Sequence, residues 1–284
     1  MKILKYTSLA CITVFLGLFL QHNKAFAEDR YALIIGNADY TYAEKLRNPV
    51  NDANDIAASL KKVGFNVEVK FNVTDAELRK SIDAYTTRLK SQDTVGLFYY
   101  AGHAIQLNGN NYLAPINFQF SNPDDIQHSG FDLRILLDKL SEANNKANVI
   151  VLDSCRNNPF SHIDEGELSR SIKKSDRGLI RKNKEKQIVQ DAGLGSMDAP
   201  INTLIAYSTK PGYVAADGIG RNSPYTEALI KAINVDGLPI AQVFADVRKS
   251  VYNNTQGKQL PWESSSLTDS FQFKTRKRTY VTPF

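Results

Sequence analysis

The sequence predicts one α/β domain built on a largely parallel β-sheet with helices on both faces. Three observations indicate this class. Short apolar runs alternate with helical stripes along the chain, most of these runs are apolar throughout, and 284 residues with 42% hydrophobic side chains are enough for one large core. Strands that are apolar throughout are typical of a sheet buried on both faces, and strands that alternate with helices are typical of parallel connections.

The N-terminal part of this domain predicts two strand–helix units. Residues 30–36 form a short apolar run that ends at a glycine, and an Asn-Pro pair precedes an apolar helical stripe over residues 50–63. Residues 65–71 alternate in polarity, as half-buried strands do. A Thr-x-x-Glu capping box then opens a helix expected over residues 74–89. The expected order up to this point is βαβα.

The rest of the chain continues the pattern. Residues 94–100 and 148–152 are continuous apolar runs that predict two further strands, and residues 131–143 carry four leucines at helical spacing. A fifth strand and two helices complete the expected elements, over residues 203–207, 225–233 and 240–252.

A long segment of low apolar periodicity separates the fourth and fifth strands, over residues 161–198. Within it, residues 170–186 hold eight Lys and Arg side chains against two acidic ones. A connection of this length is unusual in a compact domain unless it is functional or lacks fixed structure. Two interpretations stay open: a solvated charged loop, or a loop that is cleaved next to its basic residues.

Residues 1–27 have the composition of a secretory signal peptide. Lys2 and Lys5 precede an apolar stretch over residues 9–20, and the segment ends in Ala-Phe-Ala. A stretch of this length is short for a membrane span. We expect cleavage after Ala27, export to a periplasm or out of the cell, and no membrane attachment once the leader is removed.

The leader carries three lysines and no acidic residue, so its removal lowers the formal net charge from +5 to +2. A charge of this size argues against nucleic-acid binding. The expected organisation is a signal peptide over residues 1–27, a folded domain over residues 28–272 and a basic tail over residues 273–284.

The number and positions of the cysteines limit the kinds of site that the chain can form. The chain has two cysteines, and Cys11 lies inside the leader, so Cys155 is the one thiol of the exported chain. A disulfide within the monomer and a cysteine-rich zinc site are therefore excluded. A lone thiol in an oxidising compartment is either buried in the core or reactive.

Two reactive side chains follow two apolar strands directly. His103 comes after residues 94–100, and Cys155 comes after residues 148–152. In an open parallel sheet, ligands bind beyond the carboxyl ends of the strands. If these strands are neighbours, the imidazole and the thiol stand about 5 Å apart at the backbone. An imidazole there would take the thiol proton and later protonate a leaving amine.

The same sheet edge offers hydrogen-bond donors for an oxyanion. The main-chain N–H of Cys155 and that of Ala104, at the turn expected after His103, would be free of ladder bonds at a strand-to-loop transition. Gly102 would permit a close backbone approach at this turn.

Rival site residues carry weaker signals. His128 and His162 lie in polar segments and read as surface residues, and Ser154 lacks the flanking glycines of a nucleophile elbow. A metal site made of His103, Asp153 and His162 lacks a compact ligand spacing. No metal and no cofactor are therefore expected.

Several segments together resemble the bacterial caspase-like peptidases, relatives of metacaspases and paracaspases. The segments that carry the resemblance are Arg30-Tyr-Ala-Leu-Ile-Ile-Gly-Asn37, Tyr99-Tyr-Ala-Gly-His-Ala104, Val151-Leu-Asp-Ser-Cys-Arg-Asn-Asn-Pro-Phe160, Leu204-Ile-Ala-Tyr-Ser-Thr-Lys-Pro-Gly212 and Asn222-Ser-Pro-Tyr-Thr-Glu-Ala-Leu229. His103 precedes Cys155 by 52 residues, a separation similar to that of the family's histidine.

This resemblance implies a caspase-like three-layer α/β/α sandwich with a mostly parallel six-stranded sheet, with His103 as general base and acid and Cys155 as nucleophile. It also implies that Asp52, Asp153 and Asp217 form an acidic pocket that binds Arg or Lys. A carboxylate at Asp52 also suits the start of a helix, so that simpler interpretation stays open.

The sequence departs from the family at three places. Ala104 stands where the family has glycine, and Asp-Ser-Cys-Arg-Asn replaces the caspase signature around the nucleophile. Asn117 stands where calcium-dependent metacaspases have an acid, so calcium activation is not implied.

The resulting prediction is a cysteine endopeptidase that cleaves peptides or proteins after Arg or Lys through a thioacyl enzyme, activated by self-cleavage within residues 170–186. Two rivals stay open. One is a caspase-like binding or signalling module without activity, and the other is a cysteine acyltransferase or ligase in which an amine resolves the thioester.

Overall fold

The computed structural model describes residues 28–119, 123–155, 194–211, 213 and 215–276, and of Cys155 it describes the main chain only. Its strands are β1 (Asp29–Gly36), β2 (Asn66–Phe71), β3 (Thr94–Leu107), β4 (Asn110–Leu113), β5 (Phe131–Asp132), β6 (Ala147–Cys155), β7 (Thr203–Tyr207) and β8 (Trp262–Ser265). Its helices are α2 (Pro49–Lys62), α3 (Asp75–Arg88), α4 (Pro123–Ser129), α5 (Leu133–Ala143), α7 (Pro224–Ile233) and α8 (Ile240–Asn254).

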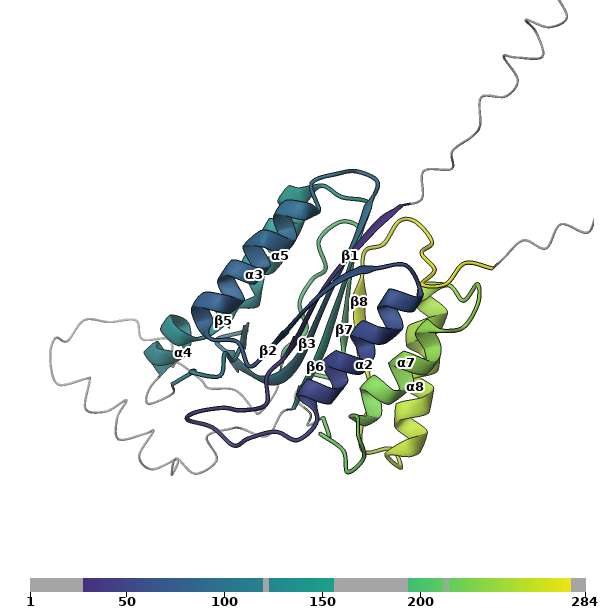
Figure 1. The fold of residues 1–284 in the computed structure, drawn as a ribbon. Coiled ribbons are helices and arrows are strands. Elements are labelled where there is room, and N and C mark those ends of the chain that lie inside the picture. Colours follow the sequence, from purple (N-terminus) through teal and green to yellow (C-terminus); the bar gives the residue numbers. More distant parts are fainter. Residues whose placement is uncertain (1–27, 120–122, 156–193, 212, 214, 277–284) are drawn as a thin grey trace, which may run out of the picture.

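The architecture is a three-layer sandwich (Figure 1), with α2, α7 and α8 on one face of the sheet and α3 and α5 on the other. The main sheet has the strand order β2-β1-β3-β6-β7-β8. Every neighbouring pair in it is parallel except β7 and β8. This confirms the predicted mostly parallel six-stranded sheet, to which β4 and β5 add a small antiparallel sheet beside β3.

The central strands are apolar throughout because each one supplies both cores. In β1, Ala32 and Ile34 pack on the side of α2, whereas Leu33 and Ile35 pack on the side of α3. All four are at most 2% exposed. Burial of an aliphatic side chain stabilises a fold by roughly 1.5–3 kcal/mol. Among the described residues, no helix has the length and apolarity needed to cross a membrane.

One strand is longer than the sequence pattern predicted. We expected a strand over residues 94–100 and a turn around Ala104, but β3 continues to Leu107, where its end pairs with β4. The connection is a two-residue turn in which Asn108 and Gly109 have φ values of 51° and 79°. Positive φ at both positions is typical of the Asn-Gly hairpin turn. His103 therefore lies inside a strand, where β3 leaves one sheet for the other.

Three short strands and one short helix were not predicted. They are β4, β5, β8 and α4. Their two to seven residues are too few to show a period, and residues 131–132 at the start of the predicted helix form β5 instead. Tertiary pairing, more than local pattern, forms such short edge strands.

The segment that re-enters the described structure after residue 193 is fixed to the hairpin next to His103. The side-chain amide of Asn111 in β4 donates to the carbonyl of Gly195, and the N–H of Gly195 donates to Asn111 Oδ1, both at 2.8 Å. Asn111 is fully buried and Leu194 is 1% exposed. The start of this returning segment is therefore held against β4.

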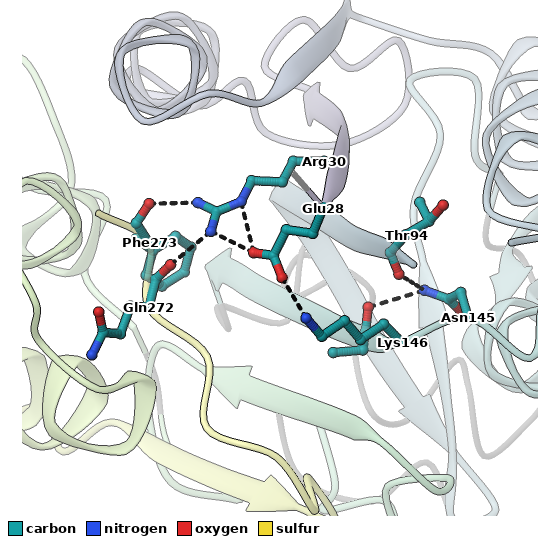
Figure 2. A network of polar contacts seen from close by, with 8 residues as sticks. Glu28, Arg30, Thr94, Asn145, Lys146, Gln272 and Phe273 are labelled. Atoms are coloured by element: carbon teal, nitrogen blue, oxygen red, sulfur yellow. Dashed lines mark hydrogen bonds and ion pairs between the residues drawn. The ribbon is translucent and has the colours of Figure 1, made fainter. Parts of the chain in front are cut away.

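At the other end of the sheet, where β1 begins, side chains connect the two described ends of the chain (Figure 2). Arg30 Nη1 donates to the carbonyl of Phe273 at 2.6 Å, and Nη2 donates to that of Gln272 at 3.1 Å. The Arg30 guanidinium pairs with Glu28, which also accepts from Lys146 Nζ at 2.8 Å. One arginine thus links β1 to the segment after β8.

Replacement of Arg30 by Ala is expected to lower the free energy of unfolding by about 2–4 kcal/mol, since it leaves several partly buried partners unpaired. Arg30→Lys should recover little of this, because one ammonium cannot reproduce the planar guanidinium contacts. Lys231→Ala, which breaks an exposed pair with Glu227, is the matched control and should cost less than about 1 kcal/mol. Urea unfolding measures all three; equal losses for Arg30→Ala and Lys231→Ala would contradict the linking role.

Candidate active site

His103 and Cys155 lie opposite each other on neighbouring strands. β3 and β6 pair in parallel, and the Cα of His103 is in register with that of Cys155. Adjacent strands in a sheet lie about 4.8 Å apart. The prediction that the two strands are neighbours is therefore confirmed, although the Cys155 side chain lies outside the described residues.

The imidazole of His103 is buried and held by one ring nitrogen. Nε2 lies 2.8 Å from the main-chain carbonyl oxygen of Glu44, and the residue is 1% exposed. Because a carbonyl only accepts, the neutral ring carries its proton on Nε2. Nδ1 is buried and has no hydrogen-bond partner among the described residues. Its lone pair is thus available to take a proton.

Burial is the main influence on the pKa of His103 and lowers it below the ordinary value. The hydrogen bond to the Glu44 carbonyl and the charges of Glu44 and Asp217 act in the opposite direction, because they favour the imidazolium. A ring that is neutral near pH 7 can act as a general base, and the nearby negative charges stabilise the cation that forms during proton transfer.

Ala104 lies in β3 and not in a turn. It stands opposite Leu113 of β4, and the flanking bond runs from the N–H of Ala114 to the carbonyl of His103 at 3.0 Å. In this pattern Ala104 and Leu113 form a non-hydrogen-bonded pair, so the N–H of Ala104 points away from β4. The expected strand-to-loop transition is wrong, but the pairing still leaves this N–H out of the β3–β4 ladder.

The structure brings Asp52 and Asp153 together through one serine. The N–H of Ser223 donates to Asp52 Oδ1 at 3.0 Å, and its hydroxyl donates to Asp153 Oδ2. Thr226 also donates to Asp153 Oδ2, at 2.8 Å. Asp52 lies in the first turn of α2, Asp153 precedes Cys155 by two residues in β6, and Ser223 caps α7. Three elements therefore meet at this acidic site.

Asp217 stands beside this pair on the loop before α7. Its carboxylate accepts from the N–H groups of Arg47 and Asn48, at 2.8 and 3.3 Å. Its charge raises the pKa of Asp52 and that of Asp153 and also acts on His103. The three carboxylates predicted from the sequence thus lie within electrostatic reach of one another, and Asp217 also lies within reach of the imidazole.

Burial disfavours the charged form of both carboxyls. Burial and then the charge of Asp153 raise the pKa of Asp52 to about 8, and burial raises the pKa of Asp153. Neither side chain forms an ion pair with any of the described residues. A guanidinium or ammonium placed between them would supply the missing charge. In the described part of the chain, no group of three or more His, Cys, Asp or Glu side chains is arranged to hold a metal ion.

A comparison with protein families identifies the family of this chain. The model of the caspase domain matches residues 29–272, which include all eight strands and both candidate catalytic residues. The chain belongs to the caspase family of cysteine peptidases.

Individual relatives of this caspase-family chain are distant. It is 30% identical over 134 residues to human mucosa-associated lymphoid tissue lymphoma translocation protein 1, which is 47% of this chain and 16% of that protein. The mouse homologue is 29% identical over 136 residues, with similar coverage. The chain therefore spans a small part of the curated relatives that it matches.

A solved caspase has the same fold. The crystal structure of caspase-1 from Spodoptera frugiperda superposes with a TM-score of 0.60 and 17% identity, covering 88% of this chain and 93% of that chain. The predicted caspase-like sandwich is thereby confirmed.

Of the rival residues, His128 lies apart from this site, His162 lies outside the described residues, and Ser154 lies beside Cys155 in β6. His128 is exposed on α4, where Nδ1 contacts the carbonyl oxygen of Asp124 at 2.7 Å, so its interpretation as a surface residue is confirmed. His162 and the whole of residues 170–186 lie outside the described residues. Ser154 is 1% exposed, and its hydroxyl has no partner in the described part of the chain.

Sequence reasoning missed the groups that hold the predicted site residues in place. These are the Glu44 carbonyl and the side chains of Tyr40, Tyr100, Ser223 and Thr226. Ser223-Pro224 is a helix-start signal that announces a cap, but nothing in the sequence announces its second contact with Asp153.

The caspase-family chain should gain stability at alkaline pH when Asp52 is replaced by Asn. Between the ordinary pKa of 3.8 and about 8, the folded state keeps the Asp52 proton while the unfolded state loses it. Stability contributed by this protonated group is complete below pH 3.8 and is lost as pH rises through 8. The variant should therefore melt at a higher temperature at pH 9 and show no gain at pH 4.

Asp55→Asn, one turn further along α2, is the matched control. Hydrogen bonding to Arg221 lowers the pKa of Asp55, so this variant should bring no alkaline gain. Melting curves from pH 4 to pH 9 measure both; an Asp52→Asn shift that is the same at every pH would refute the explanation.

Proposed function

We propose that this caspase-family chain is a cysteine endopeptidase that cleaves after Arg or Lys, with Cys155 as nucleophile and His103 as general base and acid. The observation that carries the proposal is the cluster of Asp52, Asp153 and Asp217 at the strand ends that bear the two catalytic residues. Three carboxylates beside a nucleophile favour a cationic side chain next to the scissile bond.

The proposed reaction has two stages, acylation of Cys155 and hydrolysis of the thioester. Nδ1 of His103 takes the Cys155 proton, and the thiolate attacks the scissile carbonyl. The N–H groups of Cys155 and Ala104 would donate to the resulting oxyanion. The tetrahedral intermediate then breaks its C–N bond, and the imidazolium gives its proton to the leaving amine. Water, deprotonated by the same imidazole, hydrolyses the thioester and restores the thiol.

Substrate selection rests on charge neutralisation in the acidic site. A buried carboxyl with a raised pKa ionises when a cation binds, and the pair is then stabilised in a site with little water. A guanidinium can bond two carboxylates at once through its planar set of N–H groups, so arginine is the better partner. Binding of a basic substrate should therefore release protons near neutral pH.

Self-cleavage within residues 170–186 and export after removal of residues 1–27 complete the proposal. Both segments lie outside the described residues. Their support is the sequence: eight basic residues in the loop match the specificity that we propose for the site. The wild-type chain should thus be processed in this loop, and Cys155→Ala should remain intact; an unprocessed chain with full activity would contradict this part.

The test is hydrolysis of fluorogenic peptides by residues 28–284, with Arg, Lys, Asp, citrulline or Ala before the reporter. We expect much faster release from the Arg and Lys peptides than from the Asp, citrulline and Ala peptides, and none with Cys155→Ala. Citrulline is the matched probe because it has nearly the shape of Arg without its charge. No release from any peptide by a chain whose basic loop has been cut would overturn the proposed peptidase and favour the binding module.

A further inference from the structure

Two buried tyrosines enclose the main chain of His103. The N–H of His103 donates to the hydroxyl oxygen of Tyr40 at 2.7 Å. The hydroxyl of Tyr100 donates to the carbonyl of His103 at 2.7 Å and also reaches that of Ala114 at 2.9 Å. The two hydroxyl oxygens are 3.3 Å apart, and both tyrosines are at most 2% exposed.

The hydrogen bonds among these groups form a closed ring in which each group donates to the next. The Tyr100 hydroxyl proton goes to the carbonyls, so Tyr100 accepts in its contact with Tyr40 and Tyr40 donates. The ring runs from the His103 N–H to Tyr40, from Tyr40 to Tyr100, and from Tyr100 back to the His103 carbonyl. Both main-chain groups of the catalytic histidine are thereby bound by side chains.

Gly102 makes this enclosure possible. A Cβ at this position would lie 2.5 Å from the Tyr40 hydroxyl oxygen and 2.8 Å from that of Tyr100. Distances below 3 Å are repulsive for such atoms, so only glycine lets the two hydroxyls approach the strand here. Close packing of the two hydroxyl groups therefore requires glycine immediately before His103.

The same loop also holds the imidazole. The Tyr40 ring packs against the His103 ring at a centroid distance of 4.5 Å, and the carbonyl of Glu44, four residues later, binds Nε2 at 2.8 Å. The position of Nδ1 is thus set by the main chain of His103 on one side and by residues 40–44 on the other. β3 changes from one sheet to the other at this point. Sheet pairing alone therefore holds His103 less firmly than it holds a residue in the interior of a strand.

We propose that Tyr40 and Tyr100 are positioning residues that hold His103 in the geometry needed for proton transfer. This inference rests on the proposed peptidase function. A displacement of about 1 Å at a reacting group can cost about 100-fold in rate. Loss of this ring of hydrogen bonds should therefore reduce catalysis without changing the acidic site that we propose binds the substrate.

The test compares Tyr40→Phe with Tyr85→Phe in the active protein. Tyr40→Phe keeps the aromatic ring and removes the hydroxyl. Tyr85 is the matched control, because it is 3% exposed and its hydroxyl has no partner among the described residues. We expect Tyr40→Phe to lower kcat by about 10- to 100-fold with KM unchanged. It should also move the acidic limb of the kcat/KM profile to lower pH, because burial stays and the Glu44 hydrogen bond that raises the pKa of His103 is weakened. Tyr85→Phe should change neither.

A second readout is independent of peptidase activity. In ¹⁵N NMR of Cys155→Ala, the ring nitrogens of His103 report which of them is protonated, and Tyr40→Phe should broaden or shift the Nε2 signal while Tyr85→Phe leaves it in place. If the wild type cleaves no peptide, the proposed function fails and this spectrum still tests the positioning.

Equal kcat, pH profile and NMR spectrum for Tyr40→Phe and Tyr85→Phe would overturn the inference. Tyr100→Phe, which removes the other hydroxyl of the ring, gives the same comparison if Tyr40→Phe does not fold. The double variant should lose no more activity than the worse single one, because both hydroxyls act through the main chain of His103.

Discussion

Replacement of His103 by Asn is expected to lower kcat/KM for an Arg peptide by at least ~10³-fold, because the reaction loses both its base and its acid. Nδ1 of His103 is the buried ring atom without a partner among the described residues, so no neighbouring described group is placed to substitute for it. His128→Asn is the matched control, since His128 is exposed on α4, and it should leave the rate unchanged.

The pH dependence of Cys155 alkylation checks the physical reason. With His103 present, iodoacetamide should react at a pH well below the ordinary thiol pKa of about 8.5, because an imidazolium stabilises the thiolate. In His103→Asn the reaction should move toward that value. A variant that keeps more than a tenth of the wild-type activity would show that another group transfers the proton.

Replacement of Asp153 by Asn is expected to remove most of the selectivity for basic peptides. Loss of one partner of a buried, hydrogen-bonded charge pair costs about 2–5 kcal/mol, which corresponds to a fall of roughly 30- to 4,000-fold in kcat/KM for the Arg peptide. Activity on the citrulline peptide should fall little, since its side chain carries no charge. The ratio of the two kcat/KM values therefore isolates the charge from any general disturbance.

Asp55→Asn serves as the control for this experiment. Asp55 lies one turn after Asp52 on α2 and pairs with the exposed Arg221, so the Arg-to-citrulline ratio should keep its wild-type value. Thermal melting should accompany both variants. An Asp153→Asn protein that is folded and still prefers Arg by the wild-type ratio would remove Asp153 from the specificity site.

The main features of the site could be predicted because they depend on sheet topology. His103 and Cys155 each follow a continuous apolar run, and parallel strands bring their carboxyl ends to one edge. Asp153 belongs to the same strand as Cys155, so it had to lie nearby. The resemblance to the caspase-like peptidases added Asp52 and Asp217, whose positions depend on loops.

The supporting contacts could not be predicted, because they depend on the path of the main chain. The Glu44 carbonyl has no side-chain signal, and the ring around His103 exists only because the loop after β1 returns to Gly102. The extension of β3 had a signal in the Asn108-Gly109 pair, which is a hairpin turn sequence. β8 had none, since four residues at an edge show no period.

The pairing of β6 with β7 has a consequence for a chain that has been cut. These strands flank residues 156–193, and they are joined by five registered residue pairs. Arg30 binds the carbonyls of Gln272 and Phe273 from the far side of such a cut, and Asn111 binds Gly195. A break in the intervening segment would therefore yield two polypeptides that share one core, migrate separately in denaturing gels and elute together from a sizing column.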